Sequence, residues 1–417
     1  MSALGAVFAK PDGNVFDMPG LQAVADDGRI TPAIAADFIP LPEGALLLTL
    51  PGRSVVGYRG GASVSVDSFE GDDICAVAAA LPLGYTRTLL PAYVARPNAP
   101  PLPLYGYAAV AWRDGAFHVG AMRTDHLESW SPASHADQVL RRAIKSRRHE
   151  FPDSPLLAQL ERCALEYGCY TAQNAFLRQG EAAIPVSPAC NARCIGCISE
   201  QEPAAGIQSA QARVRAVPDV REIAALAVAH LEGADDAIVS FGQGCEGEPL
   251  LAAPRIAAAI RAIRARTTRG TIHINTNASR PHALEQLIDA GLQSVRVSLN
   301  AVRPAAYAAY YRPRGYDLDD VIESIRIAGE RGAALSLNLL THPGVTDDPD
   351  EMDAFEALLR DHRIDMVQTR TLNVDPAVYF ALVGRPAREP VGMRRWFEWM
   401  RATFPPMRLG NFTRGFG

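Results

Sequence analysis

Between about residues 181 and 376, short apolar segments alternate with longer segments whose apolar residues recur at helical spacing. The short segments predict strands at 183–188, 237–242, 271–277, 294–300, 334–340 and 365–371. The longer segments predict amphipathic helices at 220–232, 255–266, 281–290, 319–331 and 349–360. Strands that alternate regularly with helices are typical of a parallel α/β architecture.

The predicted strands carry polar side chains on one face, because successive side chains along a strand point to opposite sides. The polar positions are His273, Asn275 and Asn277, then Arg296, Ser298 and Asn300, then Ser336 and Asn338, and last Gln368 and Arg370. Burying an unpaired polar group costs roughly 2–7 kcal/mol in transfer experiments. We therefore expect this face to line a lumen that holds a ligand or cofactor, or else to form an internal hydrogen-bond network.

The chain changes character upstream of this region. Residues 1–130 contain short strand candidates punctuated by Pro and Gly, with hairpins predicted at 45–58 and 105–122 and a helix at 73–80. We expect a small, mainly β N-terminal domain of unknown role there. Downstream, residues 377–417 predict a C-terminal helix and tail.

Residues 131–180 predict a helical connector of two helices. The first helix carries a basic run made of Arg141, Arg142, Lys145, Arg147, Arg148 and His149. Such a run usually forms a solvated face, and a docking site for an anionic partner is the alternative.

Composition favours a soluble enzyme with more than one domain. The 417 residues are 48% hydrophobic and 21% charged, and the net charge of −5 argues against a dedicated nucleic-acid binder. The seven cysteines are odd in number and unevenly spread, which argues against a disulfide framework and favours a reducing cytoplasm. No window reaches about 18 apolar residues and no secretion signal is evident, so we expect a cytoplasmic protein without a membrane span.

Three cysteines lie at CxxxCxxC spacing directly after the first predicted strand: Cys190, Cys194 and Cys197. Thiolates this close together favour an iron-sulfur cluster or zinc, and both normally take four ligands. A structural zinc knot closed by Cys163, Cys169 or a histidine is the alternative, although the chain has no second two-cysteine knuckle. A [4Fe-4S] cluster held by three cysteines instead leaves one iron open.

This motif resembles the signature of the radical S-adenosylmethionine (SAM) superfamily. The resemblance covers about half of the chain, from the strand before Cys190 to roughly Asp375. It implies a partial (β/α)6 TIM-like barrel over residues 181–376. It also implies a [4Fe-4S] cluster on the three cysteines and S-adenosyl-L-methionine chelated by the open iron. Reductive cleavage of SAM would give a 5'-deoxyadenosyl radical that abstracts hydrogen from a substrate.

A second motif follows the second predicted strand. The run from Gly242 to Leu250 resembles the superfamily's Gly-Gly-Glu-Pro motif, with Glu246 in place of the first glycine. The resemblance implies that Gly247, Glu248 and Pro249 cradle the SAM amino group. It further implies that Ser298, Asn300 and Asn338 face the SAM carboxylate and ribose, with Asn300 the best ribose candidate.

One position departs from the family pattern. The superfamily commonly has an aromatic residue directly before the third cysteine, near the adenine, and this chain has Gly196. The adenine would then be packed by other groups, such as Ile195, Ile198 or the fifth strand. Residues 307–316 form a cluster of tyrosines and arginines, in which Arg312 is a candidate carboxylate clamp. A packed loop of stacked tyrosines is the equal alternative.

The remaining chemistry is assigned to the last strand and one thiol. Gln368, Arg370 and Asn373, with Asp375, are predicted substrate contacts, because the last strand borders the mouth of a partial barrel. His273 and Arg296 are expected to reach the same space. Cys245 lies in the glycine-rich loop and is a candidate radical relay or nucleophile, although a free cysteine is more often an inert apolar residue.

These observations predict a radical SAM enzyme acting on a peptide or small metabolite. The resemblance implies a cytoplasmic electron donor such as flavodoxin or ferredoxin as a partner. Two alternatives remain open: an RNA-modifying radical SAM enzyme that uses the basic helix, and a non-catalytic zinc-stabilised binding protein.

Overall fold

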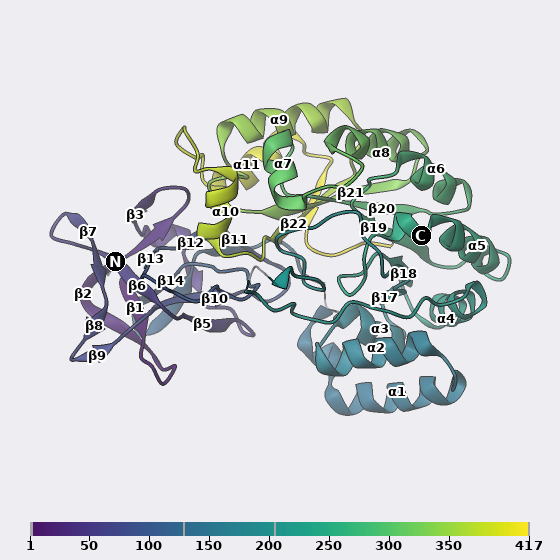
Figure 1. Cartoon of the computed structure of the whole chain (residues 1–417), viewed down its shortest axis with the longest axis horizontal. Coiled ribbons are helices and arrows are strands. Elements are labelled where there is room, and N and C mark those ends of the chain that lie inside the picture. The colour runs from purple at the N-terminus through teal and green to yellow at the C-terminus, as the bar shows by residue number, and fades with distance from the viewer. Residues whose placement is uncertain (1–2, 128–129, 204–205, 416–417) are drawn as a thin grey trace.

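A curved parallel sheet and its helices form one half of the molecule, beside the N-terminal strands, in the computed structural model, which describes residues 3–127, 130–203 and 206–415 (Figure 1). Its seven strands pair in chain order: β17 (Glu181–Ala183), β18 (Ile238–Phe241), β19 (Thr271–Thr276), β20 (Ser294–Leu299), β21 (Ala334–Thr341), β22 (Met366–Thr371) and β23 (Arg408–Gly410). Every neighbouring pair is parallel. This confirms a curled, parallel half-barrel with an additional mainly β region.

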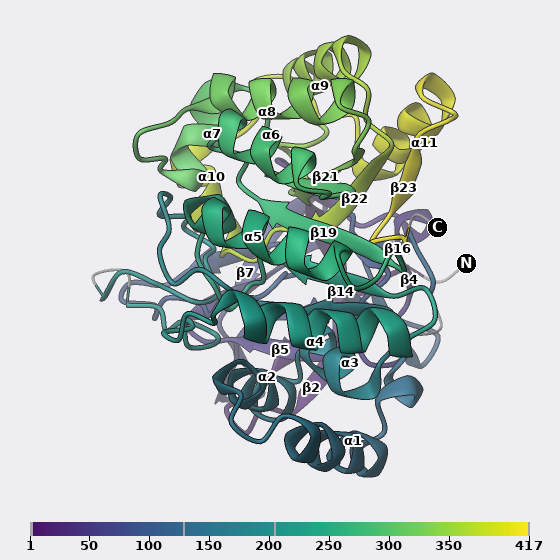
Figure 2. The same cartoon turned by 90° about the vertical axis from the view of Figure 1, so that its right-hand side faces the viewer.

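Helices cover the outer face of the sheet, and Figure 2 shows several of them side by side. They are α4 (Val220–Gly233), α5 (Ala253–Arg264), α6 (Pro281–Asp289), α7 (Pro304–Tyr311), α8 (Leu318–Glu330), α9 (Pro349–Asp361), α10 (Pro376–Val383) and α11 (Met393–Thr403). Local signals begin them: Asp219 caps α4, Asp348 caps α9, and Asp317 forms a capping box at α8. Their apolar stripes join the sheet in one large core.

The predicted strands 237–242, 271–277, 294–300, 334–340 and 365–371 agree with the structure to within about one residue at each end. The prediction for 183–188 was wrong beyond its first residue. The amides of Val186 and Ser187 donate to the carboxylate of Glu246 at 2.7 and 2.8 Å instead of to a neighbouring strand. Helix α7 and strand β23 were not predicted from the sequence.

The N-terminal region is built from short strands: β1 (Gly5–Ala9), β2 (Val15–Asp26), β3 (Ile30–Pro32), β4 (Ile39–Pro40), β5 (Leu46–Leu50), β6 (Arg53–Arg59), β7 (Ala62–Val66), β8 (Ser68–Phe69), β9 (Asp72–Asp73), β10 (Ala76–Ala80), β11 (Tyr85–Arg87), β12 (Leu90–Pro91), β13 (Tyr93–Ala95), β14 (Val110–Arg113), β15 (Ala116–Val119) and β16 (Ala121–Arg123). The predicted hairpin around Arg113-Asp114-Gly115 is confirmed, since β14 pairs β15 across a turn in which Asp114 and Gly115 have φ of 52° and 81°.

Two predictions in this region were wrong for one reason. The segment expected to be a helix at 73–80 contains strand β10, which pairs antiparallel with β5. The hairpin expected at 45–58 required β5 to pair with β6. Instead β5 pairs with β10, and β6 pairs with β2, β7 and β13. Residues 76–79 are buried between strands, so tertiary packing overrides the helix propensity of an alanine-rich segment.

The connector holds three helices where two were predicted: α1 (Asp137–Glu150), α2 (Pro155–Glu166) and α3 (Tyr170–Leu177). Three of the six residues of the basic run form ion pairs within the described protein. Arg141 pairs with Asp137, Arg147 with Glu150, and Arg148 with Glu161. None of the described helices has the length and apolar character needed to cross a membrane.

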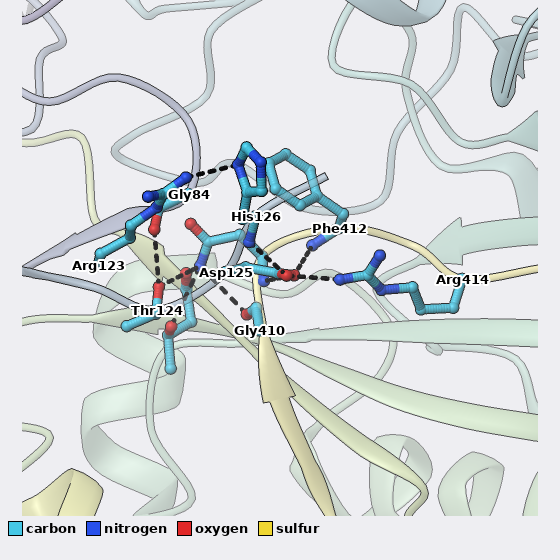
Figure 3. Close-up of polar contacts among 10 residues, drawn as sticks. Gly84, Arg123, Thr124, Asp125, His126, Gly410, Phe412 and Arg414 are labelled. Carbon is cyan, nitrogen blue, oxygen red and sulfur yellow. Dashed lines mark hydrogen bonds and ion pairs between the residues drawn. The ribbon is translucent and has the colours of Figure 1, made fainter. Parts of the chain in front are cut away.

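The C-terminal tail is held by Asp125, which follows β16 (Figure 3). The Asp125 carboxylate accepts hydrogen bonds from the amides of Asn411 and Phe412 at 2.8 and 3.1 Å and pairs with Arg414. The N-terminal region therefore fixes the segment that supplies β23. Residues 416 and 417 lie outside the described residues.

A buried ion pair joins the N-terminal region to the loop after β22. Arg53 Nη2 lies 3.1 Å from Asp375 Oδ2, each side chain is only 5% exposed, and Tyr93 donates to the same carboxylate. Asp375 also accepts from the Ala377 amide and so caps α10. Asp375 was predicted to contact substrate, but the structure assigns its carboxylate to these protein partners.

Replacing Asp375 with Asn should lower the free energy of unfolding by about 3–5 kcal/mol, because the Arg53 cation then lies buried without its counter-charge. Urea unfolding would measure the loss. Arg388→Gln is the matched control: its pair with Asp350 is exposed, at 61% for Arg388, and its loss should cost at most about 1 kcal/mol. Equal effects of the two changes would contradict the assignment.

Candidate functional site

The loop that carries the three cysteines is held by the end of helix α7. The amides of Arg193 and Ile195 donate to the carbonyls of Tyr311 and Tyr310 at 2.9 and 3.1 Å. These carbonyls are free to accept because a helix leaves its last carbonyls without intrahelical partners. The unpredicted helix α7 is therefore what shapes the cysteine loop.

The glycine-rich loop after β18 closes over the base of the cysteine loop. Gly247 and Glu248 donate their amides to the carbonyls of Ser187 and Ala189 at 2.7 and 2.8 Å. A Cβ atom at Gly247 would lie 2.0 Å from the Ala189 carbonyl oxygen, so no larger residue fits without moving backbone. The two motifs found in the sequence thus form one continuous contact.

Glu246 ties the same two loops together through its side chain. One carboxylate oxygen accepts from Val186 and Ser187, and the other accepts from the amides of Gly242 and Gln243 at 2.7 and 2.8 Å. Burial raises the pKa of Glu246 to about 7, while the four amide donors favour the ionised form. Glu246, which stands where the family has a glycine, therefore links the two loops by hydrogen bonds. Its position in the motif did not predict this role.

Glu248 uses its side chain inside the protein as well. Its carboxylate accepts from the amides of Leu250 and Asn277 at 2.9 and 2.8 Å and from the hydroxyl of Thr276. Pro249 then begins a short 3-10 helix at 249–252. The predicted contact with the SAM amino group would therefore fall to backbone groups of this loop and not to the Glu248 carboxylate.

All three cysteines line one cavity of about 950 Å³. Its other lining residues include Arg213, Arg312, Arg314, Val374 and Val378. Burial and the neighbouring thiols raise the pKa of Cys194 well above its usual value, and burial raises that of Cys190. Protonated thiols in such a site become good ligands when a metal centre replaces their protons.

The donor set fits an iron-sulfur cluster, although the coordination geometry is not preformed. Within the described ranges, no three His, Cys, Asp or Glu side chains converge closely enough to hold a single metal ion. Three thiols on one cavity and the soft character of sulfur nevertheless suit such a cluster. The fit therefore rests on the donors and the space they enclose.

Gly196 has a packing reason that the sequence did not show. A Cβ atom there would lie 2.7 Å from the Tyr310 hydroxyl and 3.0 Å from Val374 Cγ2. Tyr310 is buried against Tyr311 and Tyr379. An aromatic ring from α7 thus occupies the space beside the third cysteine, where the family commonly has an aromatic residue in the cysteine loop itself.

The residues predicted to contact SAM differ in accessibility. Asn300 is fully buried, and its Nδ2 donates to the Ala306 carbonyl and the Tyr379 hydroxyl at 3.0 and 2.9 Å. Ser298 and Asn338 are register partners on β20 and β21 and are only partly buried. Of these three residues, Asn300 is therefore the least accessible to a ligand, because its side chain is buried and hydrogen-bonded within the protein.

Arg312 ends helix α7 in the left-handed conformation, with φ of 46°. Its side chain is about half exposed and lines the cysteine cavity, 3.9 Å from Glu202. The tyrosines beside it instead pack together, with ring centroids of Tyr307 and Tyr311 4.7 Å apart. The cluster is therefore a packed tyrosine group with one arginine at the rim of the cavity.

The lower lumen of the half-barrel contains an internal hydrogen-bond network. His273 contacts Ser294 Oγ and Asn275 Oδ1 at 2.7 and 2.9 Å, and Arg296 donates to Gln368 Oε1 at 2.8 Å. Burial lowers the pKa of His273 to about 4, so its ring is neutral near pH 7. For His273, Arg296 and Gln368 the internal network, left open as an alternative, describes the structure.

Arg370 differs from these residues. It lines a separate cavity of about 400 Å³ between β21–β22 and the N-terminal region, together with Asn373, Tyr105 and Gly106. Burial lowers the pKa of the Arg370 guanidinium to about 10. In the described part of the chain, no carboxylate lies within ion-pair distance of it.

The segment 370–375 borders both cavities. Arg370 and Asn373 face the 400 Å³ cavity, whereas Val374 and Asp375 line the cavity of the cysteines. A molecule bound by Arg370 would therefore contact the same short segment that lines the cavity of the cysteines.

Cys245 faces away from both cavities. It is 5% exposed and lies in the main core, in the same cluster as Cys163 on α2. This placement gives no support to the prediction that Cys245 takes part in catalysis and agrees with the inert alternative.

Comparison with known proteins identifies one domain. Residues 184–355 match the family model described as the radical SAM superfamily. No curated protein sequence matches the chain significantly.

Several solved structures resemble the chain distantly. Methylornithine synthase (PylB) has 16% identity and a TM-score of 0.39 over 66% of this chain and 75% of its own. Streptococcus suis SuiB bound to precursor peptide SuiA has 13% identity and a TM-score of 0.39 over 58% and 53%. A radical SAM methyltransferase from Sphaerobacter thermophilus has 20% identity and a TM-score of 0.41 over 55% and 65%. The chain thus spans between about half and three quarters of these structures.

Replacing Gly247 with Ala should separate the two loops, because the new Cβ would meet the Ala189 carbonyl. We expect reconstituted protein to hold markedly less iron and sulfide than the parent, with a lower melting temperature. Gly5→Ala is the control, since its Cβ would make only an ordinary contact of 3.6 Å. Parental iron content in Gly247→Ala would show that the close approach is not needed.

Proposed function

Because residues 184–355 match the family model of the radical SAM superfamily, we propose that the protein is a radical SAM enzyme whose cluster is bound by Cys190, Cys194 and Cys197. The observation that carries this proposal is that all three thiols line one cavity, and that the Gly-Gly-Glu-Pro-like loop hydrogen-bonds to the segment leading into the cysteine loop. A [4Fe-4S] cluster held by these thiols would supply the electron that cleaves S-adenosyl-L-methionine to a 5'-deoxyadenosyl radical.

The other cysteines support a cluster with three protein ligands. Cys163 and Cys245 lie in the main core, Cys169 lies beside Thr171 on α3, and Cys75 packs in the N-terminal region. None of these four thiols lines the cavity, so the described chain offers no fourth thiolate there and leaves one position for SAM. All seven cysteines are free, which fits the proposed reducing cytoplasm.

We assign the SAM contacts by accessibility. Backbone groups of Gly247, Glu248 and Pro249 would face the amino group, and Ser298 with Asn338 would face the ribose. Arg312, at the rim of the cavity, can offer a fork of two parallel hydrogen bonds to the SAM carboxylate. Asn300 would act from the wall, by holding Tyr379 and α7 in place.

The substrate would bind between the half-barrel and the N-terminal domain, with Arg370 and Asn373 as contacts and Gln368 behind them. The unpaired Arg370 guanidinium favours a substrate that carries a carboxylate, either a peptide or a small metabolite. We propose a mainly β domain at 1–130, a helical connector at 131–180, the partial barrel at 181–376 and a C-terminal helix and tail at 377–417. Residues of the first domain, such as Tyr105, form one side of the proposed substrate cavity.

The RNA-modifying alternative has less support, because ion pairs within the connector occupy Arg141, Arg147 and Arg148. The proposed partner for reduction is a small acidic electron carrier such as flavodoxin or ferredoxin, which would dock near the cavity of the cysteines.

Anaerobically reconstituted, dithionite-reduced protein should cleave SAM to 5'-deoxyadenosine, because it holds the cluster that transfers the electron. Chromatography would follow the nucleoside, beside a Cys190/Cys194/Cys197→Ala variant that should form none. Zinc in place of iron and sulfide in the parent protein would overturn the proposed function.

Replacing Arg370 with Leu should weaken substrate turnover at least tenfold, because a lost charge-assisted hydrogen bond is worth about 1.5–3 kcal/mol. Iron content and SAM affinity should stay at parental values, since Arg370 lines the other cavity. Loss of the cluster in this variant would contradict the assignment.

A further inference from the structure

A guanidinium lies directly against one of the three thiols. Arg213 Nη2 donates to Cys197 Sγ at 3.3 Å, within the range of hydrogen bonds to sulfur. Arg213 comes from the segment before α4, outside both sequence motifs, so neither the cysteine spacing nor the glycine-rich loop pointed to it.

Arg213 is held firmly in this position. Its Nε and Nη2 both donate to Ser199 Oγ at 3.2 Å, and Nη1 pairs with Glu200. The next residue, Val214, donates its amide to the Cys245 carbonyl at 2.8 Å and so fixes the backbone to the glycine-rich loop. A guanidinium anchored on both sides remains in one geometry, so little conformational entropy is lost in holding the contact with sulfur.

Arg213 lines the same cavity as the three cysteines, and its guanidinium donates to the Cys197 sulfur. The side chain is only 14% exposed, whereas that of its partner Glu200 is 66% exposed. Water therefore screens the Glu200 carboxylate more than the Arg213 cation, so Glu200 cancels only part of the arginine's effect on the Cys197 sulfur.

We propose that Arg213 is a positioning residue that raises the reduction potential of the cluster through its hydrogen bond to the Cys197 sulfur. This inference rests on the proposed function. Reduction adds one electron, and hence one negative charge, to the cluster and its thiolates. A nearby cation and a hydrogen bond to sulfur both stabilise the more negative state, which makes the cluster easier to reduce.

The test is a redox titration of the reconstituted protein, with dithionite as the source of the electron and electron paramagnetic resonance as the readout. Arg213→Gln should shift the midpoint potential to a more negative value. Arg213→Lys, which keeps the charge but loses the planar fork, should shift it less in the same direction. Iron and sulfide content, measured first, confirms that each variant holds the cluster.

The matched control is Arg215→Gln, which removes the same charge two residues further along the segment, from an exposed side chain. Its potential should equal that of the parent. Parental potentials in Arg213→Gln and Arg213→Lys, or a shift as large in Arg215→Gln, would overturn the inference. If Arg213→Gln cannot hold the cluster, the smaller negative shift in Arg213→Lys still decides, and its absence counts against the proposal.

The outcomes also separate this inference from the proposed function. A parent protein that holds zinc, or forms no 5'-deoxyadenosine with a full iron load, contradicts the proposed function. A parent that cleaves SAM, with variants whose potentials do not move, contradicts only the role of Arg213.

Discussion

The carboxylate of Glu246 joins the two loops on which the site depends. It accepts hydrogen bonds from four backbone amides, two in the segment that leads to the cysteines and two in the turn after β18. The amides of Gly247 and Glu248 donate to carbonyls of the same segment that Glu246 holds, so the three residues join the two loops together. Without the Glu246 carboxylate, four buried amides would each lose their partner, which is costly.

The sequence predicted the half-barrel well, and the reasons are local. Strands such as 294–300 and helices such as 319–331 carry their own hydrophobic period and capping residues, so neighbouring positions are sufficient to identify them. The prediction of a strand at 183–188 was wrong because amides in this segment donate to Glu246, about 60 positions away. The helix predicted over the alanine-rich segment at 76–80 was wrong because pairing with a neighbouring strand, and not intrinsic propensity, decides its conformation.

The candidate site was predictable to the same extent. The cysteine spacing and the glycine-rich loop are compact motifs, so they could be found by inspection. Arg213 reaches the cavity from a segment without a motif, and the contact of Tyr310 with Gly196 joins two segments about 110 residues apart, so only folding reveals either. The sequence correctly predicted that these polar side chains share one face of the sheet. Within that face, His273 hydrogen-bonds to Asn275 and Arg296 to Gln368. Arg370 instead lines the 400 Å³ cavity and has no ion-pair partner among the described residues.

The order of contacts in space differs from their order in the chain. The cysteine loop at 190–197 is shaped by the carbonyls of Tyr310 and Tyr311, which are synthesised much later. A growing chain folds from its N-terminal side, so the three thiols leave the ribosome before the helix that holds them exists. Until α7 forms, the thiols belong to a flexible segment open to oxidants and stray metal ions. The loop therefore takes its folded shape only after the chain has been made through α7, more than 110 residues beyond the cysteines.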